Sequence, residues 1–307
     1  MKAYIEQRAD PYILKKDGWY YFTASVPEFD RVVLRKARTL KELPDAVEKV
    51  VWMRHESGPM SCNIWAPEIH FVDDKWYIYF AAAQAGADEN GCYDHRIYAL
   101  VNESTDPLEG SFAEAGRIDT GWESFSLDST TVVYEGKRYF IWAQRDAAIP
   151  GNSNLYIAEM ENALKLCLPA VRLSVPEYDW ECQGFLVNEG PSCLIHNGDL
   201  FVTYSASATD ERYAMGLLTL KKGENPLNPK AWKKSATPVM VTEERNGLFG
   251  PGHNSFTVDE KGSDLLVFHA RPYPGFHGTA LSDPNRHCFL RSFRYTEDGV
   301  PLFKEEE

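Results

Sequence analysis

Long hydrophobic runs are absent from this chain, which excludes the usual membrane-spanning helix. No apolar stretch approaches the ~18 residues that such a helix needs. The first ten residues also contain no apolar run of the kind that forms the centre of a secretory signal peptide. The sequence therefore predicts a protein without membrane association.

Paired cysteines are absent as well. Six cysteines occur singly and without any Cys-x-x-Cys spacing, at Cys62, Cys92, Cys167, Cys182, Cys193 and Cys288. In a chain of 307 residues with no visible signal peptide, this pattern is typical of reduced thiols rather than of a disulfide framework. We accordingly expect a cytoplasmic protein.

Positive charge is scarce. The chain has 32 Lys and Arg residues and 45 Asp and Glu residues, which gives a formal net charge of −13. This balance argues against nucleic acid or an anionic membrane as the main partner, because both carry dense negative charge. It places no restriction on a small neutral substrate. The oligomeric state is left open.

Helical periodicity is nearly absent, and only residues 39–47 could form a short helical turn. Short strand-like runs take its place, in a composition that is 44% hydrophobic and 13% aromatic. Such a chain can bury a large core, and its length allows either one large domain or two ordinary ones.

The strand-like runs form a repeat. Each unit consists of an apolar run, a tight turn and a second apolar run, with Asn197-Gly198 as the clearest hairpin turn. The five units cover residues 10–25, 66–82, 128–143, 189–207 and 253–270. Aligning Tyr20, Tyr77, Tyr139, Phe201 and Leu266 gives steps of 57, 62, 62 and 65 residues.

This repeat predicts an all-β, five-bladed β-propeller. Further strand-like runs between the hairpins bring each unit to three or four strands, and radial repetition of such units protects their edges. The period exceeds the ~40–50 residues of WD40 and kelch repeats. Two β-sandwiches explain the even spacing less well, so we expect residues 1–307 to form one domain.

The start of each hairpin carries a polar residue or a corner. These positions hold Asp10, the Ala66-Pro67-Glu68 corner, Asp128, Glu189 and His253. The innermost strands of a propeller line a central channel, so we expect these residues to meet at one end of it. Each could also simply cap its own turn, but their repetition at one place favours a common site.

Clustered carboxylates repel one another, and burial beside a like charge raises the pKa of one member. One protonated and one ionised carboxyl group are what glycoside hydrolysis requires. Trp65 and Phe185 lie near the acids in the sequence and could form apolar walls for a sugar. Arg271 could pair with a carboxylate and orient it, or lie exposed in a loop. We expect the substrate-binding residues to be Trp65, Phe185, Arg271 and His253.

His253 is either a hydrogen-bonded core residue or a ligand for a cation or water cluster on the channel axis. The long Gly- and Pro-rich loop at residues 272–287 follows the fifth hairpin. Loops of this length shape a pocket or a subunit contact, and the sequence does not choose between the two.

Several motifs together resemble glycoside hydrolase family 43. They are Ala9-Asp10-Pro11-Tyr12, Trp65-Ala66-Pro67-Glu68, Leu127-Asp128-Ser129-Thr130, Asn188-Glu189-Gly190-Pro191 and Gly252-His253-Asn254-Ser255. The resemblance implies a five-bladed propeller and an inverting hydrolase. It implies Asp10 as general base, Glu189 as general acid and Asp128 as the residue that tunes and orients the acid. It also implies a central calcium or water cluster beside His253, with no cofactor required for the chemistry.

Residues 204–207 and 213–218 resemble the α-L-arabinofuranosidase branch of the family. The chain ends at Glu307, without room for the extra β-sandwich usual in β-xylosidases. We therefore expect an exo-α-L-arabinofuranosidase that releases terminal arabinose from short arabino-oligosaccharides and takes part in hemicellulose degradation. The alternatives are a β-xylosidase, an endo-arabinanase or a galactofuranosidase on the same fold, and a sugar- or protein-binding propeller without turnover.

Overall fold

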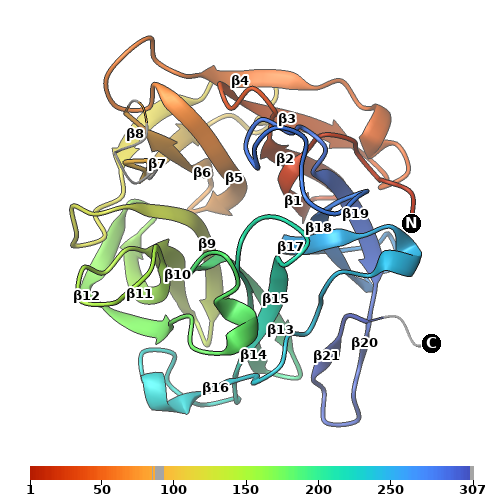
Figure 1. Ribbon diagram of the computed structural model, residues 1–307. Coiled ribbons are helices and arrows are strands. Elements are labelled where there is room, and N and C mark those ends of the chain that lie inside the picture. Colours follow the sequence, from red (N-terminus) through yellow and green to blue (C-terminus); the bar gives the residue numbers. More distant parts are fainter. Residues whose placement is uncertain (85, 87–92, 305–307) are drawn as a thin grey trace.

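The structure, a computed structural model, describes residues 1–84, 86 and 93–304, and it confirms the all-β five-bladed propeller. Five antiparallel sheets surround a central axis, with β1, β5, β9, β13 and β17 as their innermost strands (Figure 1). Blade 1 contains β1 (Ala9–Lys16), β2 (Trp19–Ser25), β3 (Arg31–Ala37) and β4 (Lys49–Met53). Blade 2 contains β5 (Cys62–Val72), β6 (Lys75–Ala83), β7 (Arg96–Asn102) and β8 (Ala113–Arg117).

The remaining blades follow the same up-and-down order. Blade 3 contains β9 (Ser126–Tyr134), β10 (Lys137–Gln144), β11 (Asn154–Asn162) and β12 (Lys165–Ser174). Blade 4 contains β13 (Asn188–His196), β14 (Asp199–Ala206), β15 (Ala214–Leu220) and β16 (Trp232–Lys234). Blade 5 contains β17 (Phe249–Val258), β18 (Asp264–Arg271) and β19 (His287–Ser292), and β20 (Arg294–Tyr295) pairs with β21 (Pro301–Leu302).

Helix is confined, in the described residues, to four 3₁₀ turns. These are η1 (Leu43–Asp45), η2 (Asp179–Glu181), η3 (Pro229–Ala231) and η4 (Glu244–Asn246). The first lies inside the helical turn expected at residues 39–47. No helix among the described residues is long and apolar enough to cross a membrane. The five described cysteines are free thiols, and Cys92 lies outside the described residues.

The first four hairpins turn through two residues of positive φ, the geometry of a type I′ turn. These pairs are Asp17 and Gly18, Asp73 and Asp74, Glu135 and Gly136, and Asn197 and Gly198. The turn residues singled out in the sequence therefore set the register of each blade.

The chain closes its own ring. The N-terminal segment lies against β19 (Figure 1), where Tyr4 donates its backbone N–H to the carbonyl of Cys288 at 2.8 Å. Cys288 returns its own N–H to the carbonyl of Ile5 at 2.8 Å. Residues near the start of the chain thus complete the outer edge of blade 5, and the last blade is tied to the first.

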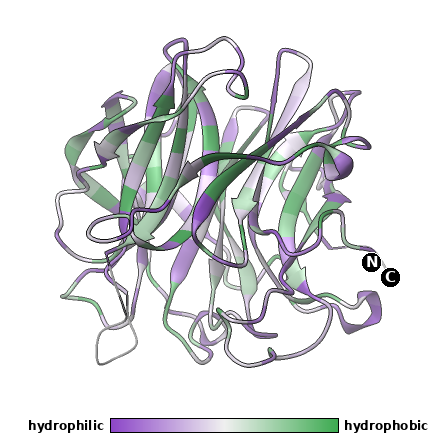
Figure 2. Cartoon of the chain, turned by 90° about the horizontal axis from the view of Figure 1, so that it is seen from above, coloured by the Kyte–Doolittle hydropathy of each residue, from purple (hydrophilic) through white to green (hydrophobic). Residues whose placement is uncertain are grey.

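The hydrophobic core is divided among the interfaces between neighbouring blades. Apolar residues follow the strands, whereas the loops at their ends are more hydrophilic (Figure 2). The interface between blades 3 and 4, for example, buries Ile141, Leu155, Leu200 and Tyr204 completely. Burial of a large apolar side chain stabilises the fold by roughly 1.5–3 kcal/mol. Packing of this kind holds each inner strand at a fixed place around the axis.

Each innermost strand is interrupted by a β-bulge at the same place, which directs side chains toward the axis. The register shifts all lie near the start of the strand. The bulged residues, all with positive φ, are Asp10, Ala66, Asp128, Gly190 and His253. This corrects the sequence alignment in one respect: Gly190, not Glu189, is the counterpart of Asp10 and Asp128, and Glu189 precedes the bulge by one residue.

A bulge frees a backbone N–H from its ladder, and in four blades the preceding blade supplies the acceptor. Ser25 Oγ accepts from Ala66 at 2.8 Å, and Ser205 Oγ accepts from His253 at 2.8 Å. Asp128 Oδ2 accepts the N–H of Gly190, and His269 Nδ1 accepts the N–H of Asp10, at 3.1 Å each. These four contacts join the five bulges in one series, from blade 3 through blades 4, 5 and 1 to blade 2.

Candidate active site

A cavity of about 280 Å³ opens where the bulged strands meet. Of the residues selected from the sequence, six line it: Asp10, Trp65, Asp128, Phe185, Glu189 and His253. Residues from all five blades, far apart in the chain, thus meet at one hollow. Glu68 is not part of the lining; its carboxylate contacts His70 Nε2 at 2.8 Å instead.

Asp10 is buried among groups that favour its ionised form. The Ser25 hydroxyl donates to Oδ2 at 2.5 Å, and Arg286 Nη1 lies 3.5 Å from Oδ1. Burial alone would raise the pKa of Asp10, but nearby His253 and Arg286 and the contact with His269 outweigh it. The pKa is held well below its usual range, so Asp10 is a carboxylate at neutral pH.

Asp128 contacts the peptide unit that directly follows Glu189. Its Oδ2 accepts the N–H of Gly190 at 3.1 Å. Burial raises the pKa of Asp128 well above its usual range, and the charges of Glu189 and Asp10 raise it further. Full ionisation of all three carboxyl groups is therefore unfavourable.

Glu189 has an environment opposite to that of Asp10. Burial raises the pKa of Glu189 to about 7, and the charge of Asp10 contributes to the rise. The phenol of Tyr213 donates to Oε1 at 2.8 Å and acts in the other direction, as does Arg286. Near neutral pH this side chain can both carry and release a proton, which is what a general acid must do.

His253 stands between the two aspartates. Its Nδ1 lies 3.4 Å from Asp10 Oδ1 and 3.6 Å from Asp128 Oδ2. Burial lowers the pKa of His253, although Asp10 opposes the shift. The imidazole also packs against Gly190: a Cβ added to Gly190 would lie 3.2 Å from His253 Cγ.

These residues do not fit a calcium ion bound directly by side chains. Calcium takes about six to eight oxygen ligands. The nearest carboxylates to His253 are those of Asp10 and Asp128, which already accept hydrogen bonds from Ser25 and Gly190. In the part of the chain that the structure describes, no group of three or more His, Cys, Asp or Glu side chains is arranged to hold a metal.

Arg271 does not line the cavity, contrary to the sequence-based expectation that it binds substrate. Its buried guanidinium pairs with Asp283, with Nη1 3.2 Å from Oδ2. The arginine that reaches the cavity is Arg286, and Leu281 from the same loop joins it. The loop at residues 272–287 therefore shapes the pocket, which answers the question that its sequence left open.

Aromatic side chains form part of the cavity wall. Trp65 stacks on His95 with ring centroids 4.0 Å apart and meets Tyr93 edge to face at 5.8 Å. These contacts hold the indole in one orientation. Phe185 also lines the cavity and is 48% exposed, so it offers an apolar surface to a ligand.

Sequence reasoning missed the polar residues that contact the proposed site carboxyl groups or their backbone, namely Ser25, Tyr213, His269 and Arg286. Ser25 and His269 occur near the ends of the second strands of their hairpins, where Ser205 also lies. That repeated position is the signal that could have found them. Tyr213 and Arg286 come from connecting segments, where no repeat marks them.

The comparison with known proteins decides the family. Residues 4–301 match glycosyl hydrolases family 43. The chain belongs to this family.

Two curated relatives are identical to this chain at about half of the aligned positions. An extracellular exo-α-(1→5)-L-arabinofuranosidase of Streptomyces avermitilis is 48% identical over 300 residues, covering 97% of this chain. The chain spans only 62% of the length of that relative. An extracellular enzyme of the same name from Streptomyces chartreusis is 50% identical over 271 residues, covering 88% of this chain and 81% of the relative.

A solved structure of an arabinofuranosidase has nearly the same fold. The crystal structure of α-L-arabinofuranosidase from Lactobacillus brevis superposes with a TM-score of 0.96 at 48% identity. The match covers 99% of this chain and 96% of that one. The extracellular names of the two Streptomyces relatives contradict the expected cytoplasmic location, which was wrong. The unpaired cysteines and the lack of an apolar run near Met1 were therefore not evidence for a cytoplasmic location.

Proposed function

We propose that this family 43 member is an inverting exo-α-L-arabinofuranosidase that releases terminal arabinose from arabino-oligosaccharides. The observation that carries the proposal is the pair of carboxyl groups with opposite pKa shifts around one cavity: Asp10 low, Glu189 about 7. The names of the similar relatives supply the sugar. Asp10 is the general base, Glu189 the general acid, and Asp128 the residue that orients and tunes the acid.

In the proposed reaction, a named residue carries out each of the two proton transfers. Glu189 gives its proton to the glycosidic oxygen as the bond from that oxygen to the anomeric carbon breaks. Asp10 takes a proton from the water whose oxygen attacks that carbon from the opposite face. Exchange of protons with solvent then restores both groups. Two carboxyl groups suffice for this chemistry, so we propose that it needs no cofactor.

Asp128 acts through Glu189 in this proposal. Its Oδ2 holds the N–H of Gly190 at 3.1 Å, which fixes the peptide unit directly after the acid. Its proximity to Glu189 also makes ionisation of both groups unfavourable. The acid is thereby held in place, and the two carboxyl groups do not ionise together.

The size of the cavity favours removal of one sugar at a time. Its volume of about 280 Å³ lies just below the ~300–1,000 Å³ typical of ligand pockets. A second hollow of about 550 Å³ shares Asn152, Gly184 and Phe185 with it. We place the terminal arabinose in the first cavity and the leaving sugar across Phe185, toward the second.

The experiment that tests the proposal is incubation with mixed arabino- and xylo-oligosaccharides. The proposal predicts free arabinose, shortening of the chain by single units and, by NMR, a first product with inverted anomeric configuration. Release of xylose would favour a β-xylosidase, and internal cleavage an endo-arabinanase. Binding without any product would favour a sugar-binding propeller.

A further inference from the structure

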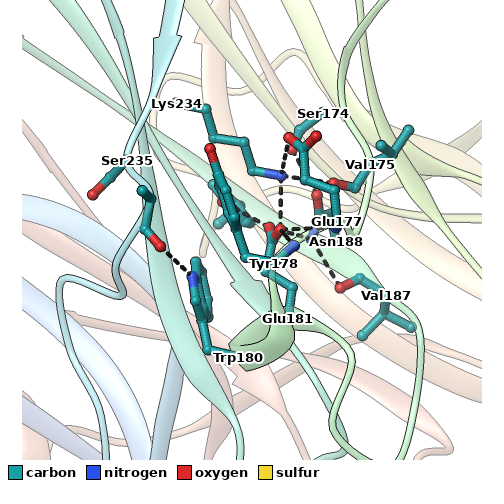
Figure 3. Close-up of polar contacts among 12 residues, drawn as sticks. Ser174, Val175, Glu177, Tyr178, Trp180, Glu181, Val187, Asn188, Lys234 and Ser235 are labelled. Carbon is teal, nitrogen blue, oxygen red and sulfur yellow. Dashed lines mark hydrogen bonds and ion pairs between the residues drawn. The ribbon is translucent and has the colours of Figure 1, made fainter.

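A second acidic side chain, Glu181, is completely buried outside the catalytic cavity. It lies in the 3₁₀ turn η2 with no exposed surface, and its Oε2 contacts Lys234 Nζ at 2.8 Å (Figure 3). Removing a carboxylate and an ammonium group from water costs several kcal/mol per ion. Buried pairs of this kind seldom improve stability over apolar residues of the same size, so its contacts deserve a functional explanation.

The carboxylate of Glu181 accepts five hydrogen bonds that divide into two sets. Oε2 accepts the backbone N–H groups of Glu177 and Tyr178, at 3.0 Å each, and the ammonium of Lys234. These three contacts anchor the carboxylate in its own loop and to β16. Oε1 accepts the Tyr204 hydroxyl at 2.8 Å and the Asn188 amide at 3.1 Å. This second set faces the inner strands of blade 4.

Asn188 transmits the anchor to the active site, because it directly precedes Glu189. Its side-chain Oδ1 also accepts the Ser174 hydroxyl at 2.6 Å, and its backbone N–H donates to the Ser153 carbonyl at 3.0 Å. Every polar group of the side chain is thus engaged (Figure 3). The start of β13 cannot shift without breaking contacts with Glu181.

The same turn shapes the rim of the cavity. Ser207, which lines the cavity, donates its hydroxyl to the carbonyl of Trp180 at 2.8 Å and accepts the N–H of Gln183 at 2.9 Å. Gly184 and Phe185, which directly follow Gln183 in the chain, also line the cavity. Glu181 therefore lies at the junction of the rim and the strand that carries Glu189.

We propose that Glu181 is a positioning residue for the general acid, acting through Asn188, with Lys234 neutralising its charge. The inference rests on the proposed role of Glu189. Misplacing a reacting group by ~1 Å can cost about 10²-fold in rate. The loss should be largest for substrates whose leaving group needs protonation, because those substrates depend on the acid.

The test compares Glu181→Gln, Asn188→Ala and the double variant on two substrates, arabinobiose and a dinitrophenyl α-L-arabinofuranoside. We expect kcat on arabinobiose to fall about 10–100-fold in each single variant, against less than about threefold on the activated aryl substrate. The double variant should lose about as much as one single variant, since both act through one hydrogen bond.

Asp106→Asn is the matched control. Asp106 pairs with Lys36 between the outer parts of blades 1 and 2, and the lysine side chain is 13% exposed, against 12% for Lys234. The control should lose stability without any dependence on the leaving group. Asn188→Ala keeps the Glu181–Lys234 pair intact, so it supplies the answer if Glu181→Gln does not fold.

Equal losses on both substrates, or fully additive losses in the double variant, would overturn the proposal. Glu189→Ala, measured beside them, separates two failures. If the loss of kcat in Glu189→Ala depends on the leaving group but the losses in Asn188→Ala and Glu181→Gln do not, only the positioning role is wrong. If Glu189→Ala shows no such dependence, the proposed acid itself is wrong.

Discussion

The hydroxyl of Tyr213 donates to Glu189 Oε1 at 2.8 Å, and the ring of the same tyrosine lies parallel to His269 at 5.8 Å. His269 in turn accepts the backbone N–H of Asp10 at 3.1 Å. One buried tyrosine thus contacts the proposed acid and the histidine that holds the proposed base. Tyr213 fixes the relative placement of the two carboxyl groups.

Replacement of Tyr213 by Phe should move the pH dependence of activity. The hydroxyl stabilises ionised Glu189, so its loss raises the pKa of Glu189 above about 7. Activity falls as pH rises through this pKa, because the acid must be protonated; the alkaline limb of kcat should therefore shift upward by about one unit. An alkaline limb that stays in place would contradict the assignment of that limb to Glu189.

Glu189→Gln should stabilise the folded protein at alkaline pH. The pKa of Glu189 rises from 4.5 to about 7 on folding, so its contribution to stability is complete below about 4.5 and is lost as pH rises through about 7. At 1.36 kcal/mol per unit, the loss is at most roughly 3 kcal/mol. Denaturant unfolding at pH 4.5 and pH 8.5 measures it: the variant should gain relative to wild type only at the higher pH. A gain of equal size at both would contradict the raised pKa.

Gly190→Ala should harm the site more than the fold. Gly190 has φ of 55°, and its added Cβ would lie 3.2 Å from His253. Gly223→Ala is the matched control, since its φ is 82° and nothing lies within 4 Å. Both variants should lose about 1–2 kcal/mol of unfolding free energy through backbone strain. Only Gly190→Ala should also lose about tenfold or more in kcat/KM; equal activity in the two would show that the His253 contact is unimportant.

The blades were predictable from sequence because their signals are local. A two-residue turn such as Asn197-Gly198 fixes the register of its hairpin without help from the rest of the chain. Repetition then placed Asp10, Asp128, Glu189 and His253 near one another. That reasoning needed only that equivalent strand ends meet on a common axis.

The finer geometry was not predictable, because it depends on contacts between blades. A one-residue bulge offset separates Glu189 from the position of Asp128, and alternation of side chains cannot resolve it. The choice between Arg271 and Arg286 depends on how a long loop folds back over the cavity. Similarly, the buried Glu181 looks in the sequence like any acidic residue of a surface loop.

Arg286→Ala should move the acidic side of the pH profile. Arg286 Nη1 lies 3.5 Å from Asp10 Oδ1 and contributes to its low pKa, so its removal raises the pKa of Asp10. Because the base must be ionised, kcat/KM should begin to fall at a higher pH on the acidic side than in the wild type. Arg117→Ala, which removes a surface pair with Glu123, should leave the profile unchanged. If the pH profile of Arg286→Ala is also unchanged, Arg286 does not lower the pKa of the catalytic base.

The most direct test of the proposed acid is the leaving-group dependence of Glu189→Ala. Rates are measured on arabinobiose and on aryl α-L-arabinofuranosides whose phenols span a wide pKa range. Loss of a general acid should cost about 10²–10⁴-fold on arabinobiose and much less on the most acidic phenol, which leaves without protonation. A loss of equal size on every substrate would contradict the assignment of Glu189 as the proton donor.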